Sequence, residues 1–174
     1  MANQQQITRI VKEGVGAWNK WRKDHPAEKL DFNNADLRGA YLGEANLQYG
    51  DFRRAKLEEA NLERANASKA NFQDAYLLGA DLTNVIMREA NLRNANLSRA
   101  DLGGADLRGA DLRGANLSTA NIEGAILINA DLRGAYLKGV SFRGANLKDA
   151  RIDKESDGRA PGKRGSWWSR LWPW

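Results

Sequence analysis

Residues 35–64 read ADLRG-AYLGE-ANLQY-GDFRR-AKLEE-ANLER, which is one five-residue pattern repeated six times. The pattern extends over residues 30–154, and its central positions fall at every fifth residue from 32 to 152, giving (152 − 32)/5 + 1 = 25 frames. Of these 25 centres, 24 are Leu, Phe, Ile or Met, and the exception is Ala67; the residue two positions earlier is Ala in 21 frames. This period fits neither a helix nor a plain strand. It predicts a solenoid of short repeats.

A corner every five residues lets the large centre and the small Ala of each frame face inward. Four corners then close a coil of 20 residues, and the next coil stacks about 4.8 Å away by main-chain pairing, as in a sheet. Gly at the fifth position of several frames suits the tight turns. Residues 20 apart therefore form columns, and one inward column consists of Phe32, Phe52, Phe72, Leu92, Leu112, Leu132 and Ile152.

Tandem frames of the form A(D/N)LXX, such as ADLGG-ADLRG-ADLRG-ANLST at residues 100–119, resemble the pentapeptide-repeat proteins. The resemblance covers residues 30–154, which is 125 of 174 residues. It implies an all-β fold, a right-handed quadrilateral parallel β-helix of about six coils, to which the sequence adds a short amino-terminal capping helix. GVGAWNKWRKDHP (14–26) is also similar to the WN-x-WR lead-in of cyanobacterial pentapeptide arrays. The family is functionally diverse, so the resemblance alone implies no single function.

The sequence divides into a capping helix and lead-in (1–29), the β-helix (30–154), and a basic linker with a Trp-rich tail (155–174). The net charge of +5 is concentrated at the two ends, because residues 31–155 carry 17 basic and 18 acidic side chains. The chain has no cysteine, which argues against disulfides and thiolate metal sites. It shows neither a secretory signal nor a membrane-spanning run, so we expect a cytoplasmic protein.

The amino-terminal segment has a helical rather than a five-residue period, with an apolar stripe formed by Ile7, Val11, Val15 and Trp18. We expect a helix over residues 5–23 that bends near Gly14 and ends at His25, which precedes a proline. Val15, Trp18 and Trp21 are predicted to cap the first coil, with the indoles near Phe32. A partner-docking helix is the alternative interpretation.

The carboxy-terminal tail places four of the six tryptophans in the last eight residues, at Trp167, Trp168, Trp172 and Trp174. Three interpretations stay open. The tail folds back over the last coil, or it is a docking peptide for a protein partner, since Trp and Arg dominate interface hot spots. Alternatively it lies at a membrane surface, where Trp and basic residues are favoured.

The sequence contains no recognisable catalytic, metal or cofactor motif, and its single histidine is the helix-terminating His25. Two pairs of carboxylates stack at coil spacing, Asp81 with Asp101 and Asp111 with Asp131, and their separation of about 5 Å is that of a retaining glycosidase. These residues alternate with asparagines on an outer wall, where hydrogen bonds to neighbouring turns explain them better. We therefore expect no enzyme activity, no metal and no cofactor.

Exceptions to the pattern indicate candidate binding surfaces. Ile86 and Ile126 replace the usual Asp or Asn in one outward column, and Ile128 follows on the same wall. Tyr76 and Tyr136 share a column on the adjacent wall. These residues predict a protein-binding face, and the alternative is that they are isolated apolar surface residues, which are common.

Three arginines, Arg93, Arg113 and Arg133, also stack in one outward column. Asp111 and Asp131, two residues earlier in the same frames, are their predicted partners, because unpaired guanidinium groups at coil spacing would repel one another. The sequence does not favour nucleic-acid binding, since the column lacks the interleaved aromatic side chains of single-strand binders.

These observations favour a non-catalytic protein-binding or scaffold module that presents rigid walls and the Trp-rich tail to a protein partner. One alternative is the branch of the family that mimics duplex DNA and interacts with DNA gyrase, which the neutral charge of the solenoid disfavours. Association with a membrane surface through the tail is another. Pairing of two copies through the carboxy-terminal end of the solenoid is also possible.

Overall fold

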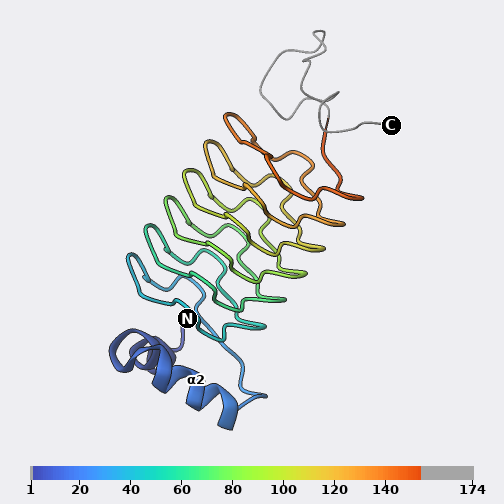
Figure 1. Ribbon diagram of the computed structural model, residues 1–174. Coiled ribbons are helices and arrows are strands. Elements are labelled where there is room, and N and C mark those ends of the chain that lie inside the picture. The colour runs from blue at the N-terminus through green and yellow to red at the C-terminus, as the bar shows by residue number, and fades with distance from the viewer. Residues whose placement is uncertain (1, 154–174) are drawn as a thin grey trace.

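The computed structural model describes residues 2–153, which form a solenoid closed at its amino-terminal end by helices (Figure 1). Twenty-one isolated parallel bridges, from Asp31↔Asp51 to Asp131↔Arg151, each join a residue to the one 20 positions later. The span from 31 to 151 therefore makes (151 − 31)/20 = 6 coils. This register is the one that the five-residue period predicts.

Every corner adopts the left-handed conformation. All 24 positions from 34 to 149 at intervals of five have φ between 55° and 75°, and 15 of them are not glycine. This conformation costs a non-glycine residue roughly 1–2 kcal/mol, which the inter-coil hydrogen bonds offset. In one frame, Phe32 N–H donates to the Asp51 carbonyl at 2.8 Å and Asn34 N–H to that of Arg53 at 2.9 Å.

Pairing along residues 31–151 consists of single-residue bridges rather than continuous strands. The sequence predicted sheet-like pairing, and the difference has a simple cause: a corner every five residues leaves one bridging residue per side. We name the four walls after their bridge residues in the first coil, which are Asp31 for wall A, Asp36 for wall B, Tyr41 for wall C and Asn46 for wall D.

The core holds the frame centres and their preceding small residues. Phe32, Phe52 and Phe72 are fully buried, and their rings stack with centroids 4.7 Å apart at each step. Gly50 takes the place of the usual Ala because a Cβ there would lie 2.5 Å from the Phe52 ring. Leu92, Leu112 and Leu132, which continue the column, are also buried.

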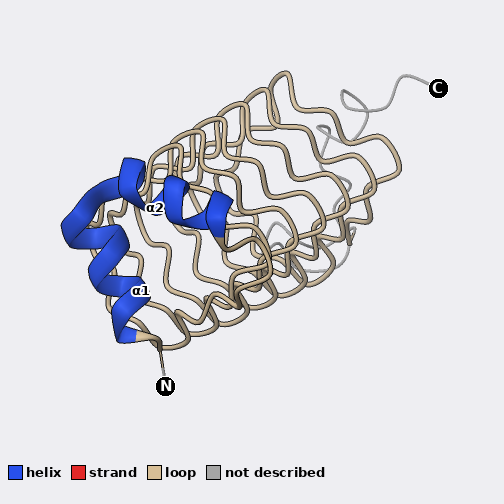
Figure 2. Cartoon of the chain, turned by 90° about the horizontal axis from the view of Figure 1, so that it is seen from below, coloured by secondary structure: helices blue, strands red, loops and turns tan. Residues whose placement is uncertain are grey.

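Helix α1 (Gln4–Thr8), a π-helical turn η1 (Arg9–Glu13) and helix α2 (Gly14–Asp24) lie across the open amino-terminal end of the coils (Figure 2). The bend comes at Gly14, whose φ is +85°. The expectation that Val11 belongs to the buried stripe was wrong, since Val11 is 49% exposed and Ile10 is buried instead. The wider i→i+5 turn of η1 displaces the stripe from its α-helical positions.

None of the helices within residues 2–153 has the length and apolar character needed to span a membrane.

Candidate protein-binding walls

The amino-terminal helices cap the first coil with side-chain amides that act as peptide groups. Gln6 is buried; its Nε2 donates to the Lys29 carbonyl at 2.7 Å, and its Oε1 accepts from Asp31 N–H at 2.9 Å. On wall D, Asn19 Nδ2 donates to the Glu44 carbonyl at 3.0 Å and Asn19 Oδ1 accepts from Asn46 N–H at 2.8 Å. Each amide thus satisfies the N–H of a bridge residue that a preceding coil would otherwise pair, and it is fixed there by its hydrogen bond to a corner carbonyl.

The indole of Trp18 fills the end of the core. It has no solvent exposure, its ring centroid lies 5.7 Å from that of Phe32, and its Nε1 donates to the Asn46 carbonyl at 2.9 Å. Trp21 and Val15 are partly buried and pack against the same core, with Trp21 5.2 Å from Trp18. The apolar face of α2 is therefore occupied by the solenoid.

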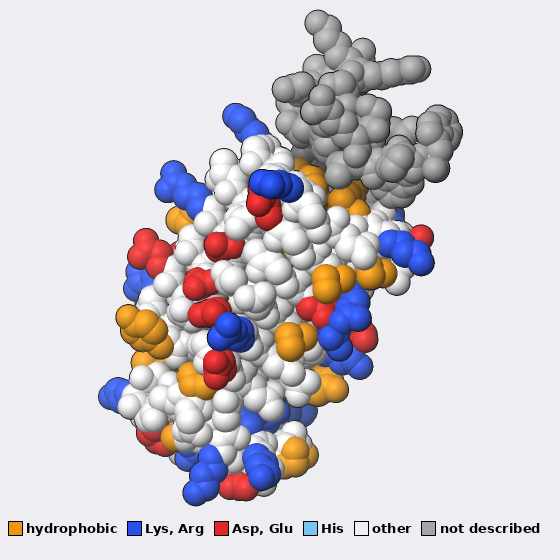
Figure 3. Space-filling view, in the orientation of Figure 1, with side chains coloured by type: hydrophobic (Ala, Val, Ile, Leu, Met, Phe, Trp, Pro, Cys, Tyr) orange, Lys and Arg blue, Asp and Glu red, His pale blue; other side chains and the backbone are white. Residues whose placement is uncertain are grey.

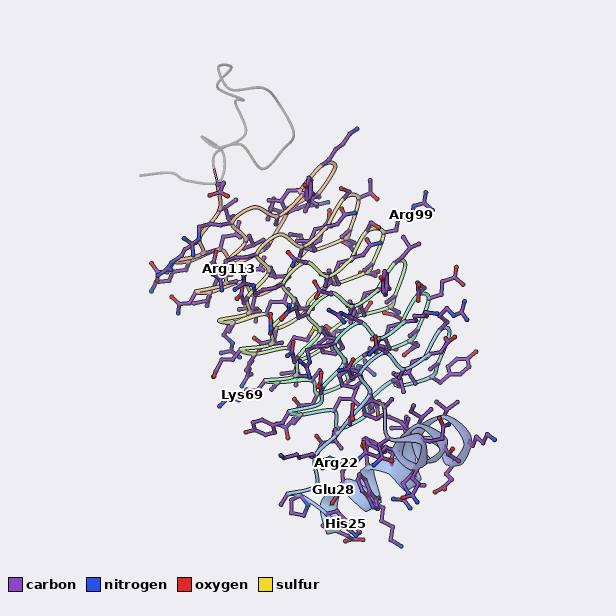
Figure 4. The ribbon with its side chains drawn as sticks, turned by 180° about the vertical axis from the view of Figure 1, so that it is seen from behind. Arg22, His25, Glu28, Lys69, Arg99 and Arg113 are labelled. Atoms are coloured by element: carbon purple, nitrogen blue, oxygen red, sulfur yellow. The ribbon has the colours of Figure 1, made fainter. Side chains whose placement is uncertain are left out.

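The turn that leaves α2 is held by Arg22. Figure 4 shows Arg22, His25 and Glu28 together at the end of this helix. Arg22 Nη1 donates to the His25 carbonyl at 3.1 Å and to the Glu28 carbonyl at 3.2 Å. Burial lowers the pKa of the Arg22 guanidinium, while the Glu28 carboxylate acts in the opposite direction. These contacts give the residues of the WN-x-WR lead-in a structural role in the cap.

The outward bridge positions carry a second regularity. All 17 Asn and Asp residues at these positions accept, through Oδ1, a hydrogen bond from the backbone N–H two residues later. Side-chain amides also link coils, as where Asn121 Nδ2 donates to Asp101 Oδ1 at 2.9 Å. These Asx turns confirm the structural interpretation of the stacked Asn and Asp residues.

Wall A carries the arginine column as a ladder of ion pairs. Arg113 Nη2 lies 2.5 Å from Asp111 Oδ2, its Nε lies 3.8 Å from Asp131 Oδ2, and Arg133 Nη2 lies 2.6 Å from Asp131 Oδ2. Hydrogen bonding to Arg133 lowers the pKa of Asp131 to about 2. The predicted pairing of these arginines with Asp111 and Asp131 is confirmed, and it neutralises most of the positive charge on this wall. In Figure 4, Arg113 points outward from the solenoid.

Wall D combines apolar side chains with a clamped carboxylate. Ile86, Ile126 and Ile128 are half-buried on its surface, and the bridges place Asp106 between Ile86 and Ile126. The Asp106 carboxylate accepts hydrogen bonds from Arg88 and Arg108, which belong to the neighbouring column of residues two positions after the bridge residues. Together these six residues, which we name the clamp surface, are Ile86, Arg88, Asp106, Arg108, Ile126 and Ile128.

The geometry of the clamp is that of a carboxylate shared by two guanidinium groups. Asp106 Oδ1 and Oδ2 accept from Arg108 Nε at 2.8 Å and Nη2 at 2.6 Å, and Oδ2 also accepts from Arg88 Nε at 2.7 Å. These hydrogen bonds, that of Arg108 first, lower the pKa of Asp106 to about 2 against the opposing effect of burial. Asp106 is buried, whereas the Arg88 and Arg108 side chains are 51% and 43% exposed.

Wall B exposes the aromatic candidates. Tyr76 is 48% and Tyr136 66% exposed, and Asn96 and Asn116 separate them in the column. Wall B is two sides of the coil away from wall D and therefore opposite it, so the prediction that these tyrosines lie on the wall adjacent to the isoleucines was wrong. Sequence reasoning missed Tyr41, which is 83% exposed; it occupies a bridge position, so the rule that identified Tyr76 could have found it.

The remaining candidates, Trp167, Trp168, Trp172 and Trp174, lie outside the described residues. Among residues 2–153, no group of three or more His, Asp or Glu side chains is placed to hold a metal ion.

These features define a four-sided parallel β-solenoid with a helical cap. The family described as "Pentapeptide repeats (8 copies)" matches residues 51–84, 75–114 and 115–152, and the chain belongs to this pentapeptide-repeat family. A right-handed quadrilateral β-helix is the fold of this family. The match indicates no enzyme family. None of the functionally curated proteins matches the chain significantly.

Solved structures of cyanobacterial pentapeptide repeat proteins are similar to the chain. Rfr23 of Cyanothece 51142 is 46% identical over 51% of this chain and 60% of its own, with a TM-score of 0.50. HetL of Nostoc sp. strain PCC 7120, described as involved in the regulation of heterocyst differentiation, is 37% identical over 68% of this chain and 60% of its own, with a TM-score of 0.32.

A third protein, alr5209 of Nostoc PCC 7120, is 31% identical over 80% of this chain and 95% of its own, with a TM-score of 0.30. The match to the present chain thus spans about three fifths of Rfr23 and of HetL, and nearly all of alr5209.

Proposed function

We propose that this chain is a non-catalytic protein-binding scaffold that presents rigid solenoid walls and a Trp-rich carboxy-terminal tail to a protein partner. The observation that carries the proposal is the presence of Ile86 and Ile126 in a wall D column whose other members are Asn or Asp. Both isoleucines occupy positions where the fold uses an Asx turn.

The isoleucines have a cost for the fold. Asn46, Asn66, Asp106 and Asn146 each accept the N–H two residues later, at 3.1–3.3 Å. Ile126 has no acceptor to offer, so a hydrogen bond worth about 0.5–1.5 kcal/mol is lost at its turn. Surface residues that lack a stabilising contact made at the equivalent positions of the fold, here the Asx turn, are typical of binding sites.

The charge distribution favours a protein partner over DNA mimicry. Figure 3 shows a row of acidic side chains along the middle of the visible face, with a few basic side chains beside it and more at the edges, and with apolar side chains in separate spots. Residues 31–155 carry 17 basic and 18 acidic side chains, so the rod lacks the dense negative charge of duplex DNA. A gyrase-directed DNA mimic is therefore the weaker alternative. Binding of nucleic acid to wall A is also disfavoured, because the arginines of this wall are paired with aspartates.

The stacked carboxylates support a non-catalytic role. Asp111 and Asp131 are bound by Arg113 and Arg133, and Asp101 accepts from Gly103 N–H at 2.9 Å in addition to Asn121. A low pKa keeps Asp131 ionised, which is unsuited to a general acid near neutral pH. We place the scaffold in the cytoplasm, and attachment to a membrane surface through the tail is the alternative location.

Site-specific photo-crosslinking in the source cell tests the proposal. A photoreactive amino acid is placed singly at Ile126, Tyr136 and Trp168, with Arg99 as the control because it is exposed at a corner and points outward (Figure 4). We expect a discrete protein adduct from at least one of the first three positions. Adducts no different from those at Arg99 would contradict the scaffold function.

Two further measurements separate the alternatives. Sedimentation with anionic vesicles, with and without Ser at all four tail tryptophans, detects a membrane-bound tail. Sedimentation velocity of the full chain detects pairing of two copies through the carboxy-terminal end. Vesicle binding that depends on the tryptophans, without any protein adduct, would favour the membrane role.

A further inference from the structure

We propose that the clamp surface of wall D docks a helix of a partner protein, with apolar side chains of that helix on Ile86 and Ile126 and an acidic side chain between them. The inference rests on the proposed scaffold function and adds the surface and the chemistry of the occupant. It requires a partner helix that lies along the axis of the rod and carries apolar residues at i and i+7 with Glu or Asp at i+3 or i+4.

The charge of the clamp selects an acidic occupant. Two guanidinium groups share the single carboxylate of Asp106, so the clamp has a net charge of +1 at neutral pH. Arg88 uses only Nε for Asp106, and within residues 2–153 its terminal nitrogens make no hydrogen bond to protein. Because Asp106 fixes the guanidinium groups in place, a carboxylate from a partner meets ordered donors.

Basic character continues along the same column. Arg88 and Arg108 are followed by Ile128 and then by Lys148, which is exposed. Of the two acidic side chains in the adjoining corner column, Glu89 lies 3.6 Å from Lys69 and is thus already paired, and Asp149 lies beside Lys148, two coils beyond the corner that follows Asp106. The surface around the isoleucines therefore attracts a partner with negative charge and repels one with positive charge.

The spacing of the isoleucines selects a helix. Ile86 and Ile126 are two coils apart, which is about 10 Å at the spacing of main-chain pairing. Residues i and i+7 of an α-helix are separated by about 10.5 Å along its axis and lie on the same face. An extended segment of that length has its end residues about three positions apart, on opposite faces. A helix thus reaches both isoleucines from one side, and its middle turn falls over Asp106.

The corners beside Asp106 leave room for the helix. Gly104 and Gly109 flank Asp106 and Arg108 on both sides, so no side chain projects from either corner of this coil. A Cβ at Gly109 would come no closer than 3.5 Å to its neighbours, and Lys69 holds the same left-handed corner two coils earlier. The fold therefore accepts a long side chain at that corner, and its absence keeps wall D accessible.

A stapled helical peptide provides the probe. It is Ala-rich, about 15 residues long, fluorescently labelled, and stapled because isolated helices of this length are marginal in water. It carries Leu at i and i+7 and Glu at i+4, and a second peptide has Lys in place of Glu. The full-length protein is titrated as wild type, as an Ile86→Asn/Ile126→Asn variant, and as a Tyr76→Asn/Tyr136→Asn variant on wall B.

Each Asn substitution reproduces a residue that the same column already contains, so both variants are expected to fold. We expect saturable binding of the Glu peptide to the wild type and to the wall B variant. The Lys peptide is expected to bind at least ~10-fold more weakly, and the wall D variant to lose binding. Circular dichroism spectra that match the wild type check that both variants are folded.

Three results would overturn the inference. The first is that the Glu peptide shows no saturable binding to the wild type, and the second is that it binds the wall D variant as tightly as the wild type. The third is that the protein self-associates and that Ile126→Asn abolishes the self-association, because the occupant of the surface would then be a second copy of the chain. Failure of this inference is distinguishable from failure of the scaffold function, because photo-crosslinked adducts from Tyr136 or Trp168 support the scaffold function whatever the peptide does.

Discussion

Replacing Ile126 by Asn tests whether the outward isoleucines serve the fold. Residue 126 bridges Asp106 and Asn146, and it precedes the buried centre Leu127. An Asn at this position can accept the N–H of Ile128, as Asn146 does from Lys148 N–H at 3.1 Å. The substitution therefore restores a turn hydrogen bond while it removes a half-buried aliphatic side chain.

The two contributions nearly cancel. The restored hydrogen bond adds about 0.5–1.5 kcal/mol to the free energy of unfolding. Complete burial of an Ile contributes about 1.5–3 kcal/mol, so removal of a half-buried one costs about half of that. The net change is within ~1 kcal/mol, or a shift in Tm of at most ~4 °C for a domain of this size. Leu127→Asn is the matched inward control, and we expect it to cost at least ~4 kcal/mol by leaving a cavity and a buried amide.

Thermal and urea unfolding followed by circular dichroism measure both variants. A loss of more than about 3 kcal/mol in Ile126→Asn would refute the reasoning, because Ile126 would then be a core residue and no evidence for a binding role. A Leu127→Asn variant that melts like the wild type would show that residue 127 does not face the core.

Three further outcomes are expected. The lowered pKa values of Asp106 and Asp131 stabilise the fold above pH ~4, and this stabilisation disappears as the pH falls from about 4 to about 2. Asp106→Asn should reduce the free energy of unfolding by about 1–2 kcal/mol at pH 7 and make it depend less on pH in urea titrations. An unchanged pH dependence of the free energy of unfolding would contradict this prediction. Gln6→Ala should cost about 2–4 kcal/mol and speed amide exchange at the first coil, because two backbone groups lose their partners; Gln5→Ala, at an exposed position, is the control. Leu102→Lys should prevent folding, since it places an ammonium in the dry core, and native-like melting would disprove the inward orientation.

The sequence was sufficient to predict the inside of the rod. The alternation of a large centre with a small residue at every fifth position forces inward packing, so the 20-residue register and the stacked Phe32, Phe52 and Phe72 follow from counting. The Arg113 and Arg133 ladder could be predicted for the same reason, because columns place the partners of each charge. Periodicity is informative wherever each contact is repeated in every coil.

The cap was harder to predict because its contacts occur once. Val11 and Ile10 both fit an apolar helix stripe, and only the π-helical turn decides which of them is buried. The roles of Gln6 and Asn19 depend on the distance of each amide from one unpaired bridge residue, which no sequence pattern records. The clamp could be predicted only in part. Asp106 and Arg108 are close in the sequence, but nothing in the sequence shows that Arg88 reaches Asp106 in the next coil.

The bridge positions show where a wall is free to carry function. Of the 25 positions from 31 to 151, 17 are Asn or Asp and make the Asx turn, and eight depart from it: Tyr41, Lys56, Tyr76, Ile86, Ile126, Tyr136, Ser141 and Arg151. Wall A departs only at its last residue, whereas the large apolar and aromatic departures lie on walls B, C and D. Ser141 keeps a turn contact, since its Oγ accepts from Arg143 N–H at 3.4 Å, whereas the apolar and aromatic departures have no acceptor at this place. Since those departures remove a stabilising turn contact, the fold alone gives no reason for this asymmetry. Docking should therefore depend on walls B to D, and a partner that binds through the ion-pair ladder of wall A would show that departures from the Asx turn do not mark the binding surface.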